Sequence, residues 1–226
     1  MKKAFILLIL LSVSLTSCLK ESGRDTGSIV SALTVVHASP NAPELEFVLD
    51  NQRVQTFTYA ERNIDYFAAF SGVRIAKIFE ANRFNNVLHQ ITLKLQSGKY
   101  YSVFVAGKKD SLSSLVLEDN LIRPSAGKAK IRFVHLSPDA PALDFDLSTE
   151  QSLASNLSFK GSTDFREVDA GTYATSITSH SGDLVHLEQE ITLDAHKTYT
   201  FWVKGLLYTD QETEELGYKL MVHDID

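Results

Sequence analysis

A seven-residue motif that occurs twice constrains the fold of this chain more than any other feature. His37-Ala38-Ser39-Pro40-Asn41-Ala42-Pro43 returns 98 residues later as His135-Leu136-Ser137-Pro138-Asp139-Ala140-Pro141. Each copy follows a short apolar run and precedes a segment in which apolar and polar residues alternate, with Leu45 and Phe47 after the first copy and Leu143 and Phe145 after the second. The spacing is about the length of a small domain. The chain therefore contains two copies of one unit.

The apolar residues in both units recur with a period of two, which is typical of β-strands. The expected strands lie near 31–38, 44–50, 53–60, 65–70, 73–80, 88–96, 100–107 and 112–118, and near 129–136, 142–148, 157–160, 164–169, 172–179, 185–193, 198–206 and 217–223. Short strands separated by Gly-rich and polar turns, without an amphipathic helix, predict an all-β chain of two tandem immunoglobulin-like antiparallel β-sandwich domains. The repeats are expected at 29–122 and 129–226, joined by a linker at 123–128 that contains Pro, Ser and Gly.

The repeated motif is predicted to form a strand–turn–strand corner. Proline presets φ for a type I turn, Asn or Asp suits the next position, and a residue before proline prefers extended backbone. Ser39 and Ser137 can bond backbone N–H groups in the turn. The residues given this structural role are His37, Ser39, Pro40, Asn41 and Pro43, with His135, Ser137, Pro138, Asp139 and Pro141 in the second copy.

Catalytic and metal-binding interpretations of the motif have less support. His135, Ser137 and Asp139 suggest a catalytic triad, but a triad also needs an oxyanion hole and a nucleophile turn, which the sequence does not supply. Asp139, Asp144 and Asp146 offer oxygen ligands for Ca²⁺, yet Asp144 and Asp146 alternate with apolar residues as on a solvated strand face. We therefore expect no catalytic residue, no metal site and no cofactor.

The N-terminus has the features of a lipoprotein signal peptide. Lys2 and Lys3 precede an apolar core at 4–11 that is too short to span a bilayer, and Leu15-Thr16-Ser17-Cys18 follows it. This tetrapeptide resembles the lipobox of bacterial lipoproteins, in which the cysteine is acylated. We therefore predict a signal peptide at 1–17, lipidation (palmitate) of Cys18, and a polar tether at 18–28. Leu19 after the cysteine favours the outer membrane of a Gram-negative bacterium, with the side of that membrane left open.

The remaining composition limits the partners. Cys18 is the only cysteine, so the fold must be held together by core burial and not by a disulfide within the chain. Loss of Lys2 and Lys3 with the signal peptide would change the net charge from −6 to about −8, which argues against nucleic acid as a partner.

The motif and its surroundings resemble the bacterial domain-of-unknown-function family DUF4397. Further matching segments are Val168-Asp169-Ala170-Gly171-Thr172-Tyr173, Ile191-Thr192-Leu193 and Lys197-Thr198-Tyr199-Thr200-Phe201. The first copy departs from the pattern with Asn41 in place of Asp, Glu46 in the following strand, and Phe70-Ser71-Gly72-Val73. The resemblance covers both units and implies envelope or secreted proteins with an immunoglobulin-like sandwich. It implies no established activity.

Two aromatic residues are the candidate binding residues. Phe104 and Trp202 occupy equivalent positions, 98 residues apart, on the strand face opposite the predicted core. A covering strand or loop, packing between the two units, or a platform for a ligand such as a sugar ring would each account for them.

The sequence therefore predicts a lipid-anchored envelope protein that acts as a noncatalytic binding or adhesion module for an envelope protein or a polysaccharide. The alternative is a structural spacer that holds another component away from the membrane. A third hypothesis is a hydrolase that uses the His and Asp residues near position 135.

Overall fold

The computed structural model describes residues 29–149, 151–182 and 184–223, which form two β-sandwiches side by side. The predicted signal peptide, Cys18 and the tether lie outside the described residues. The prediction of an all-β chain with two tandem sandwiches is confirmed. Within the described part of the chain, no helix has the length and hydropathy that crossing a membrane would need.

The first sandwich is built from two four-stranded sheets. Its inner sheet, which faces the second sandwich, has the order β4-β1-β7-β8, and its outer sheet has the order β3-β2-β5-β6. The bounds are β1 (Val30–His37), β2 (Leu45–Leu49), β3 (Gln52–Phe57), β4 (Ile64–Phe70), β5 (Gly72–Glu80), β6 (His89–Leu95), β7 (Tyr100–Lys108) and β8 (Ser111–Asp119).

The second sandwich repeats this arrangement. Its inner sheet has the order β12-β9-β15-β16 and its outer sheet the order β11-β10-β13-β14. The bounds are β9 (Lys128–His135), β10 (Leu143–Ser148), β11 (Gln151–Leu157), β12 (Arg166–Asp169), β13 (Gly171–Ser179), β14 (His186–Leu193), β15 (Thr198–Lys204) and β16 (Gly217–Val222), with a 3₁₀ turn (Glu212–Glu214) before β16.

The sheets are mainly antiparallel, as predicted, but each inner sheet also contains one parallel pairing. β1 pairs in parallel with β7, and β9 pairs in parallel with β15. The chain leaves β1 at the corner motif, builds the outer sheet, and returns to start β7 at the end where β1 also starts. Two strands that start at the same end and lie side by side must be parallel.

One expected strand is also misplaced. The sequence predicts a strand at 157–160, whereas the third strand of this sandwich is β11, at Gln151–Leu157. Lys160 has a φ value of 63°, which lies in the left-handed region and is incompatible with extended backbone. The apolar residue Phe159 therefore belongs to a turn and not to a strand.

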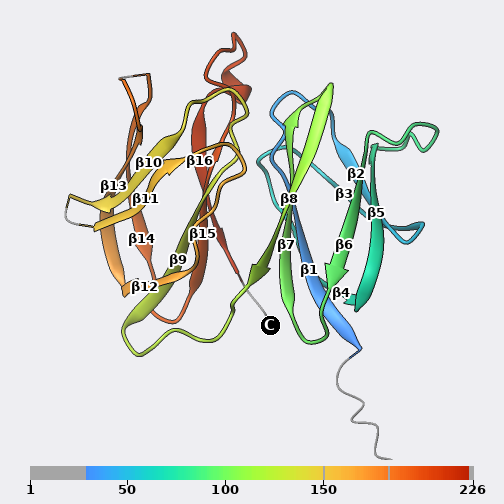
Figure 1. Ribbon diagram of the computed structural model, residues 1–226, viewed down its shortest axis with the longest axis horizontal. Helices are drawn as coiled ribbons and strands as arrows, with labels where there is room; N and C mark the ends of the chain where they lie inside the picture. The colour runs from blue at the N-terminus through green and yellow to red at the C-terminus, as the bar shows by residue number, and fades with distance from the viewer. Residues whose placement is uncertain (1–28, 150, 183, 224–226) are drawn as a thin grey trace, which may run out of the picture.

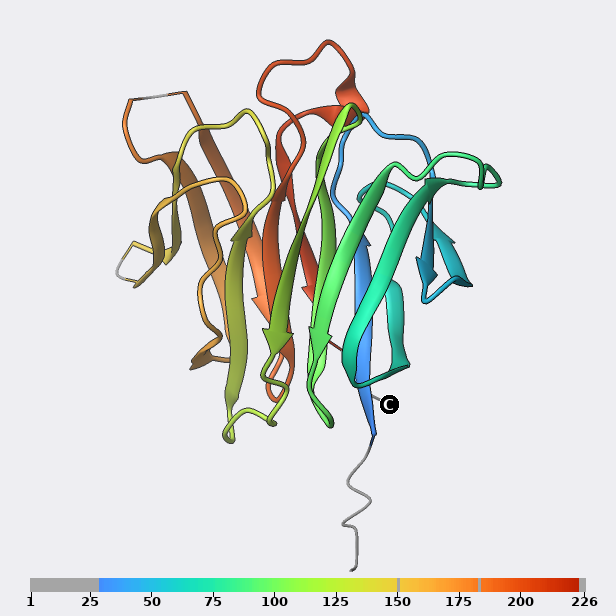
Figure 2. The ribbon, with the colours of Figure 1, turned by 45° about the vertical axis from the view of Figure 1, so that its right-hand side comes forward.

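Four layers of sheet result, and the central strands of the two inner layers, β1 with β7 and β9 with β15, are buried on both faces. Tyr101, Val103 and Val105 of β7 point into the core of their own sandwich, as the alternation predicts. The intervening residues Ser102 and Phe104 are also buried, because they face the second sandwich. Figure 2 shows β1 beginning and β16 ending at the same end of the molecule as the 120–127 connection. We call this the tether end.

The corner motif is closed by its histidine in both copies. The His37 Nε2–H donates to the carbonyl of Pro43 at 2.9 Å, and its Nδ1 accepts the Ser39 N–H at 3.3 Å. His135 makes the same two bonds with Pro141 and Ser137, at 2.9 and 3.3 Å. Burial lowers the pKa of His37 to about 4, so this imidazole is neutral at pH 7.

The fifth residue of the motif ties the corner to the turn that follows the last inner strand. Asn41 Oδ1 accepts the backbone N–H of Lys109 at 2.8 Å, and Asp139 Oδ1 accepts that of Leu207 at 2.8 Å. The strands after the corner begin at Leu45 and Leu143, two residues beyond the second proline of each motif.

The buried histidine bonds predict a large loss of stability when the ring is removed. His135→Ala leaves the Pro141 carbonyl and the Ser137 N–H without partners, so the free energy of unfolding should fall by about 2–4 kcal/mol. Urea unfolding measures this change. His186→Ala, whose side chain is 66% exposed, is the matched control and should cost less than about 0.5 kcal/mol. Equal effects of the two substitutions would contradict the role assigned to the corner.

The lowered pKa of His37 also predicts a pH dependence. Between pH 6.5 and about 4 the unfolded chain binds a proton at His37 and the folded chain does not, so stability falls as the pH falls. The stability advantage of the wild type over His37→Gln should therefore shrink by about 1.4 kcal/mol per pH unit in this window. Urea unfolding at several pH values tests this, and an advantage that does not change with pH would contradict it.

Candidate binding groove between the two sandwiches

The facing surfaces of the two inner sheets share an apolar cluster. Phe104 on β7 and Trp202 on β15 lie at its centre, with ring centroids 6.5 Å apart. The buried members are Val36, Ala38, Ala60, Phe104, Ala106, Val134, Leu136, Trp202 and Met221. Phe104 and Trp202 are 0% and 2% exposed, so neither ring is accessible to a ligand. The interpretation of these two residues as a ligand platform is therefore replaced by packing between the units.

Equivalent residues of the two copies meet across this interface. Val36 lies with Val134 in the cluster, and Phe104 with Trp202, each pair 98 residues apart in the sequence. The two sandwiches thus use the same surface to contact one another, as the subunits of a symmetric dimer do.

A buried polar network lies beside the apolar cluster and also crosses the interface. The Arg132 guanidinium on β9 reaches into the first sandwich, where its Nη2 lies 2.6 Å from Asp119 Oδ1 at the end of β8. Both side chains are almost fully buried, at 2% and 0% exposure. The Arg132 guanidinium also stacks on the Phe165 ring, 4.4 Å from its centroid.

The other hydrogen bonds of this network complete a closed ring. Arg132 Nε–H donates to Thr200 Oγ1 at 2.8 Å, and Thr200 Oγ1 bonds His223 Nε2 at 2.7 Å. His223 Nδ1 lies 2.7 Å from Tyr66 Oη, which donates to Asp119 Oδ2 at 2.6 Å. Because Tyr66 has a single proton and gives it to Asp119, His223 must donate from Nδ1, and its Nε2 then accepts from Thr200.

Burial sets the protonation states in the network. Together with the nearby Arg132 charge, it lowers the pKa of His223 to about 3, so the imidazole stays neutral. Burial also raises the pKa of the Asp119 carboxyl, while the ion pair with Arg132 and the hydrogen bonds from Tyr66 and Ser102 oppose that rise. The 2.6 Å contact between Arg132 and Asp119 is the one ion pair of this network, and neutral hydrogen-bonding groups bridge it.

The network occupies matching positions in the two copies but uses different residues. Arg132 is equivalent to Thr34, and Thr200 to Ser102. Asp119 lies opposite Tyr100 in the pairing of β7 with β8. In the second copy the backbone N–H of His223 bonds the carbonyl of Thr198, which is equivalent to Tyr100. The duplication thus supplies a symmetric surface, and the changes at these positions turn it into a directional contact between an arginine on one copy and an acid on the other.

A groove of about 620 Å³ opens on one side of this network, between the inner sheet of the first sandwich and the end of β16. Its residues come from the start of β1, from β4 and the segment before it, from the turn into β7, and from β16 of the second sandwich. They are Val30, Ser31, Ala32, Thr34, Arg62, Asn63, Asp65, Tyr66, Phe67, Ala68, Gly98, Lys99, Tyr100, Met221 and Val222. The second sandwich contributes Met221 and Val222, so this wall of the groove depends on the contact between the units.

The chemistry of the groove combines aromatic rings with paired polar groups. The Tyr66 and Tyr100 rings meet edge to face, with centroids 5.5 Å apart. The Tyr100 hydroxyl makes no hydrogen bond to the described part of the chain, which leaves it available to a ligand. The charged groups at the rim are neutralised in pairs, Arg62 with Asp65 and Lys99 with Glu118. A neutral ligand with many hydroxyl groups suits this combination.

A smaller groove of about 330 Å³ lies on the other side of the interface. Arg132 lines it at the position where the equivalent Thr34 lines the larger groove. The long guanidinium side chain fills space that threonine leaves open. The difference between the copies therefore accounts for the smaller volume of this groove.

The remaining sites predicted from the sequence fall elsewhere. His37 and His135 are buried in their corners with both ring nitrogens bonded, so neither has a free nitrogen for proton transfer. Among the described residues no group of three or more His, Cys, Asp or Glu side chains is arranged to hold a metal ion. Asp144, for example, bonds His180 and the Asn156 N–H.

The residues that form the network and the groove were not predicted from the sequence. Alternation along β9 places Arg132 on the outward face, where a charged residue is expected to meet water. The signal that would have identified it is the comparison of the copies, because a buried-strand position holds Thr34 in one and Arg132 in the other. Tyr66 and Tyr100 carry no comparable signal.

The buried ion pair across the interface predicts strong coupling between its partners. Arg132→Met and Asp119→Asn should each lower the free energy of unfolding by about 3–5 kcal/mol, because each leaves the other charge buried and unpaired. The double variant should cost less than the sum by about 2–3 kcal/mol. Urea unfolding of the four proteins measures this coupling.

The control is the exposed ion pair between Lys128 and Asp169, at 38% and 79% exposure. The same cycle with Lys128→Met and Asp169→Asn should give a coupling below about 1 kcal/mol, because water screens this pair. Similar coupling energies at the two sites would contradict the importance given to burial.

Solved structures that resemble the chain at low similarity include the following two. A carbohydrate-binding module of family CBM26 from Eubacterium rectale Amy13K, solved with maltoheptaose, aligns with a TM-score of 0.27 and 12% identity over 81% of this chain and 100% of that chain. The Bacillus anthracis TIE protein aligns with a TM-score of 0.24 and 12% identity over 77% of this chain and 34% of that chain. Matches with such low TM-scores carry no argument about function. None of the curated proteins matches the chain.

The family comparison is specific. The model described as "Domain of unknown function (DUF4397)" matches residues 31–146, just over half of the 226 residues. The matched segment runs from β1 into β10. It therefore covers the first sandwich and, in the second sandwich, β9 and the corner motif. This match agrees with the resemblance seen in the motif His-x-Ser-Pro-Asp-Ala-Pro and the strands around it. The protein belongs to the DUF4397 family.

Proposed function

We propose that this protein is a noncatalytic binding module of the bacterial cell envelope, anchored through acylated Cys18, and that its groove binds a neutral oligosaccharide segment of an envelope polysaccharide. The observation that carries the proposal is the groove itself, in which Tyr66 and Tyr100 lie beside polar groups in a space of about 620 Å³. This volume is within the usual range for small-ligand sites.

The groove offers each kind of contact that a sugar ring uses. The apolar C–H face of a sugar packs on an aromatic ring, and Tyr66 and Tyr100 provide the rings. Hydroxyl groups of the sugar need donors and acceptors, which the Tyr100 hydroxyl and the Asn63 side-chain oxygen, neither of them bonded within the described residues, supply. Because the charged side chains at the rim are paired, an uncharged ligand is favoured over a strongly acidic one.

The rigid junction between the sandwiches supports ligand binding by the full protein. A ligand that contacts β4 and β16 at once gains binding free energy from both contacts only if the distance between these two strands stays fixed. The buried network fixes this spacing, since Tyr66 belongs both to the network and to the groove. The same rigidity favours the alternative function, a structural spacer of the envelope, which would need the stiff junction and not the groove.

Substitution of Tyr100 distinguishes these two functions. A glycan array of bacterial surface and storage oligosaccharides identifies a ligand, and isothermal titration with that ligand measures its affinity. Tyr100→Ala should weaken binding at least about tenfold, the loss expected for one aromatic stacking contact and its hydrogen bond.

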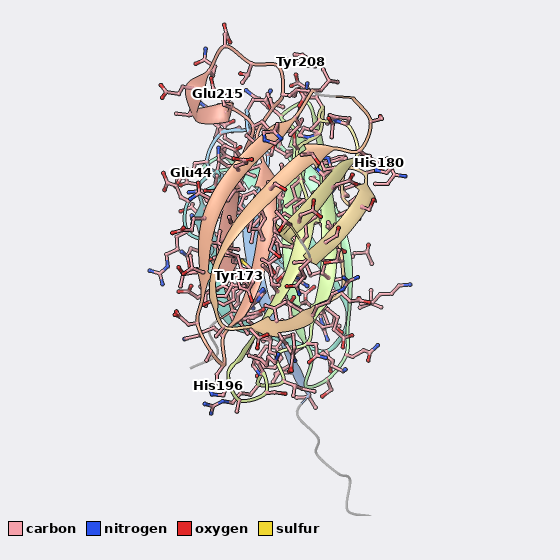
Figure 3. All side chains as sticks on the ribbon, turned by 90° about the vertical axis from the view of Figure 1, so that its left-hand side faces the viewer. Glu44, Tyr173, His180, His196, Tyr208 and Glu215 are labelled. Carbon is pink, nitrogen blue, oxygen red and sulfur yellow. The ribbon has the colours of Figure 1, made fainter. Side chains whose placement is uncertain are left out.

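Tyr208→Ala is the matched control, because Tyr208 is 70% exposed and lies at the end opposite His196 and the tether end (Figure 3). It should leave the affinity within about twofold. An array without any ligand for the folded protein, or binding that Tyr100→Ala leaves intact, would overturn the proposal. The first outcome would favour the spacer, and capture of an envelope protein through the groove would show a protein ligand instead.

A further inference from the structure

An exposed apolar tip lies at the tether end of the first sandwich. Ile29 precedes β1, and Phe70 and Val73 flank the tight turn between β4 and β5. Their exposed fractions are 65%, 60% and 65%, which are high for large apolar side chains. The three lie together, because Val30 pairs with Phe70 and the Ser71 N–H bonds the Ile29 carbonyl at 2.9 Å. We call these three residues the apolar tip.

The second sandwich has no such tip, although it has the same turn. The residues equivalent to Val30 and Phe70 are Lys128 and Asp169, which pair in the same way across β9 and β12 and form an exposed ion pair at 2.8 Å. Gly127 and Thr172 stand where the first copy has Ile29 and Val73. The fold therefore tolerates polar residues at this turn, and the apolar residues of the first copy are not needed to form it.

The turn holds the tip in a fixed conformation. Arg74 donates from Nε to the Phe70 carbonyl at 2.9 Å and from Nη2 to the Ser71 carbonyl at 2.7 Å. Gly72, with φ of 106°, supplies the backbone conformation that the turn requires. The nearby carboxylate, Asp50, is paired with Arg74, so the tip carries no unpaired acidic group from this turn. A rigid apolar tip with neutralised neighbours is suited to contact with lipid.

The position of the tip in the chain identifies the lipid surface. Ten residues lie between Cys18 and Ile29, and the eleven Cα–Cα steps that join the two span at most about 36–40 Å when fully extended. The first sandwich, which continues directly from this segment, is thus confined close to the membrane that holds Cys18. The second sandwich, whose equivalent turn is polar, follows the first in the chain and is therefore connected to the tether through the first sandwich.

We propose that the apolar tip inserts into the interfacial layer of the membrane that carries the anchor, and so orients the protein on the lipid surface. This inference rests on the anchoring at Cys18 that is part of the proposed function. Insertion of Ile29, Phe70 and Val73 places the tether end at the headgroups. The groove, which begins at Val30 and Lys99, then opens beside the bilayer.

Tryptophan quenching by brominated lipids tests the insertion. A protein of residues 18–226, which contains every described strand, is coupled through its single thiol, Cys18, to a maleimide lipid in vesicles. In the Phe70→Trp variant, bromine in the upper acyl chain should quench about half of the added emission, because an interfacial side chain reaches about 5–10 Å into the boundary. Tyr208→Trp, at the opposite end, should show no added quenching.

A second variant keeps the result independent of tryptophan chemistry. Phe70→Asp with Val73→Thr reproduces the turn of the second copy and should leave the unfolding temperature unchanged, since both side chains are exposed. Coupling the wild type to vesicles should slow hydrogen exchange in residues 70–74, and this protection should be lost in the double variant. Equal quenching of the two tryptophan variants, or equal protection in wild type and double variant, would overturn the insertion.

The two proposals fail in different ways. Thiol coupling holds the protein on the vesicles whether or not cells acylate Cys18, and mass spectrometry of membrane-extracted protein reports acylation separately. Loss of ligand binding in Tyr100→Ala does not involve the tip. An unacylated Cys18 would remove the reason for the tip to meet lipid in the cell and would therefore also overturn the inference.

Discussion

The buried ion pair between Arg132 and Asp119 is the interaction on which the arrangement of the whole molecule depends. Each sandwich has its own core, so neither needs the other to bury its apolar interior. Formation of a fully buried ion pair costs desolvation free energy. Removal of one partner costs stability as well, because the other charge is left buried and unpaired. The hydrogen bonds through Thr200, His223 and Tyr66 satisfy the remaining polar atoms. The apolar cluster contributes affinity between the units, and this ring fixes their registration.

Duplication explains how such an interface arises and why its two grooves differ in volume. A surface that meets its own copy must be self-complementary, which apolar pairs such as Phe104 and Trp202 satisfy readily. A buried charge cannot meet its own copy without repulsion. Tandem copies in one chain remove that restriction, since Arg132 can change in one copy while Thr34 stays in the other. The same change narrows one groove and leaves the other open.

Local patterns in the sequence predicted the two sandwiches, but not the parallel pairings, the position of β11 or the candidate site. Alternation along β7 identified Tyr101, Val103 and Val105 as core residues, because the side-chain period of a strand depends on the strand alone. The same alternation shows that Phe104 points away from the core but not what covers it. The burial of Arg132 could not be predicted for the same reason. On a strand that is covered on both faces, a charged side chain can be buried only if a distant residue, here Asp119, pairs with it. Contacts between units depend on registration, which no local pattern encodes.

The apolar tip and the groove depend on one another through the rigid junction. A tip of three side chains is too small to hold a protein on a bilayer, but it adds orientation once an anchor supplies the attachment. Orientation reaches the groove only if the second sandwich moves with the first, because Met221 and Val222 form one of its walls. With the network intact, a few side chains at the lipid surface set the direction in which the groove faces. Without it, the same tip would orient the first sandwich alone, and the groove would lose its second wall.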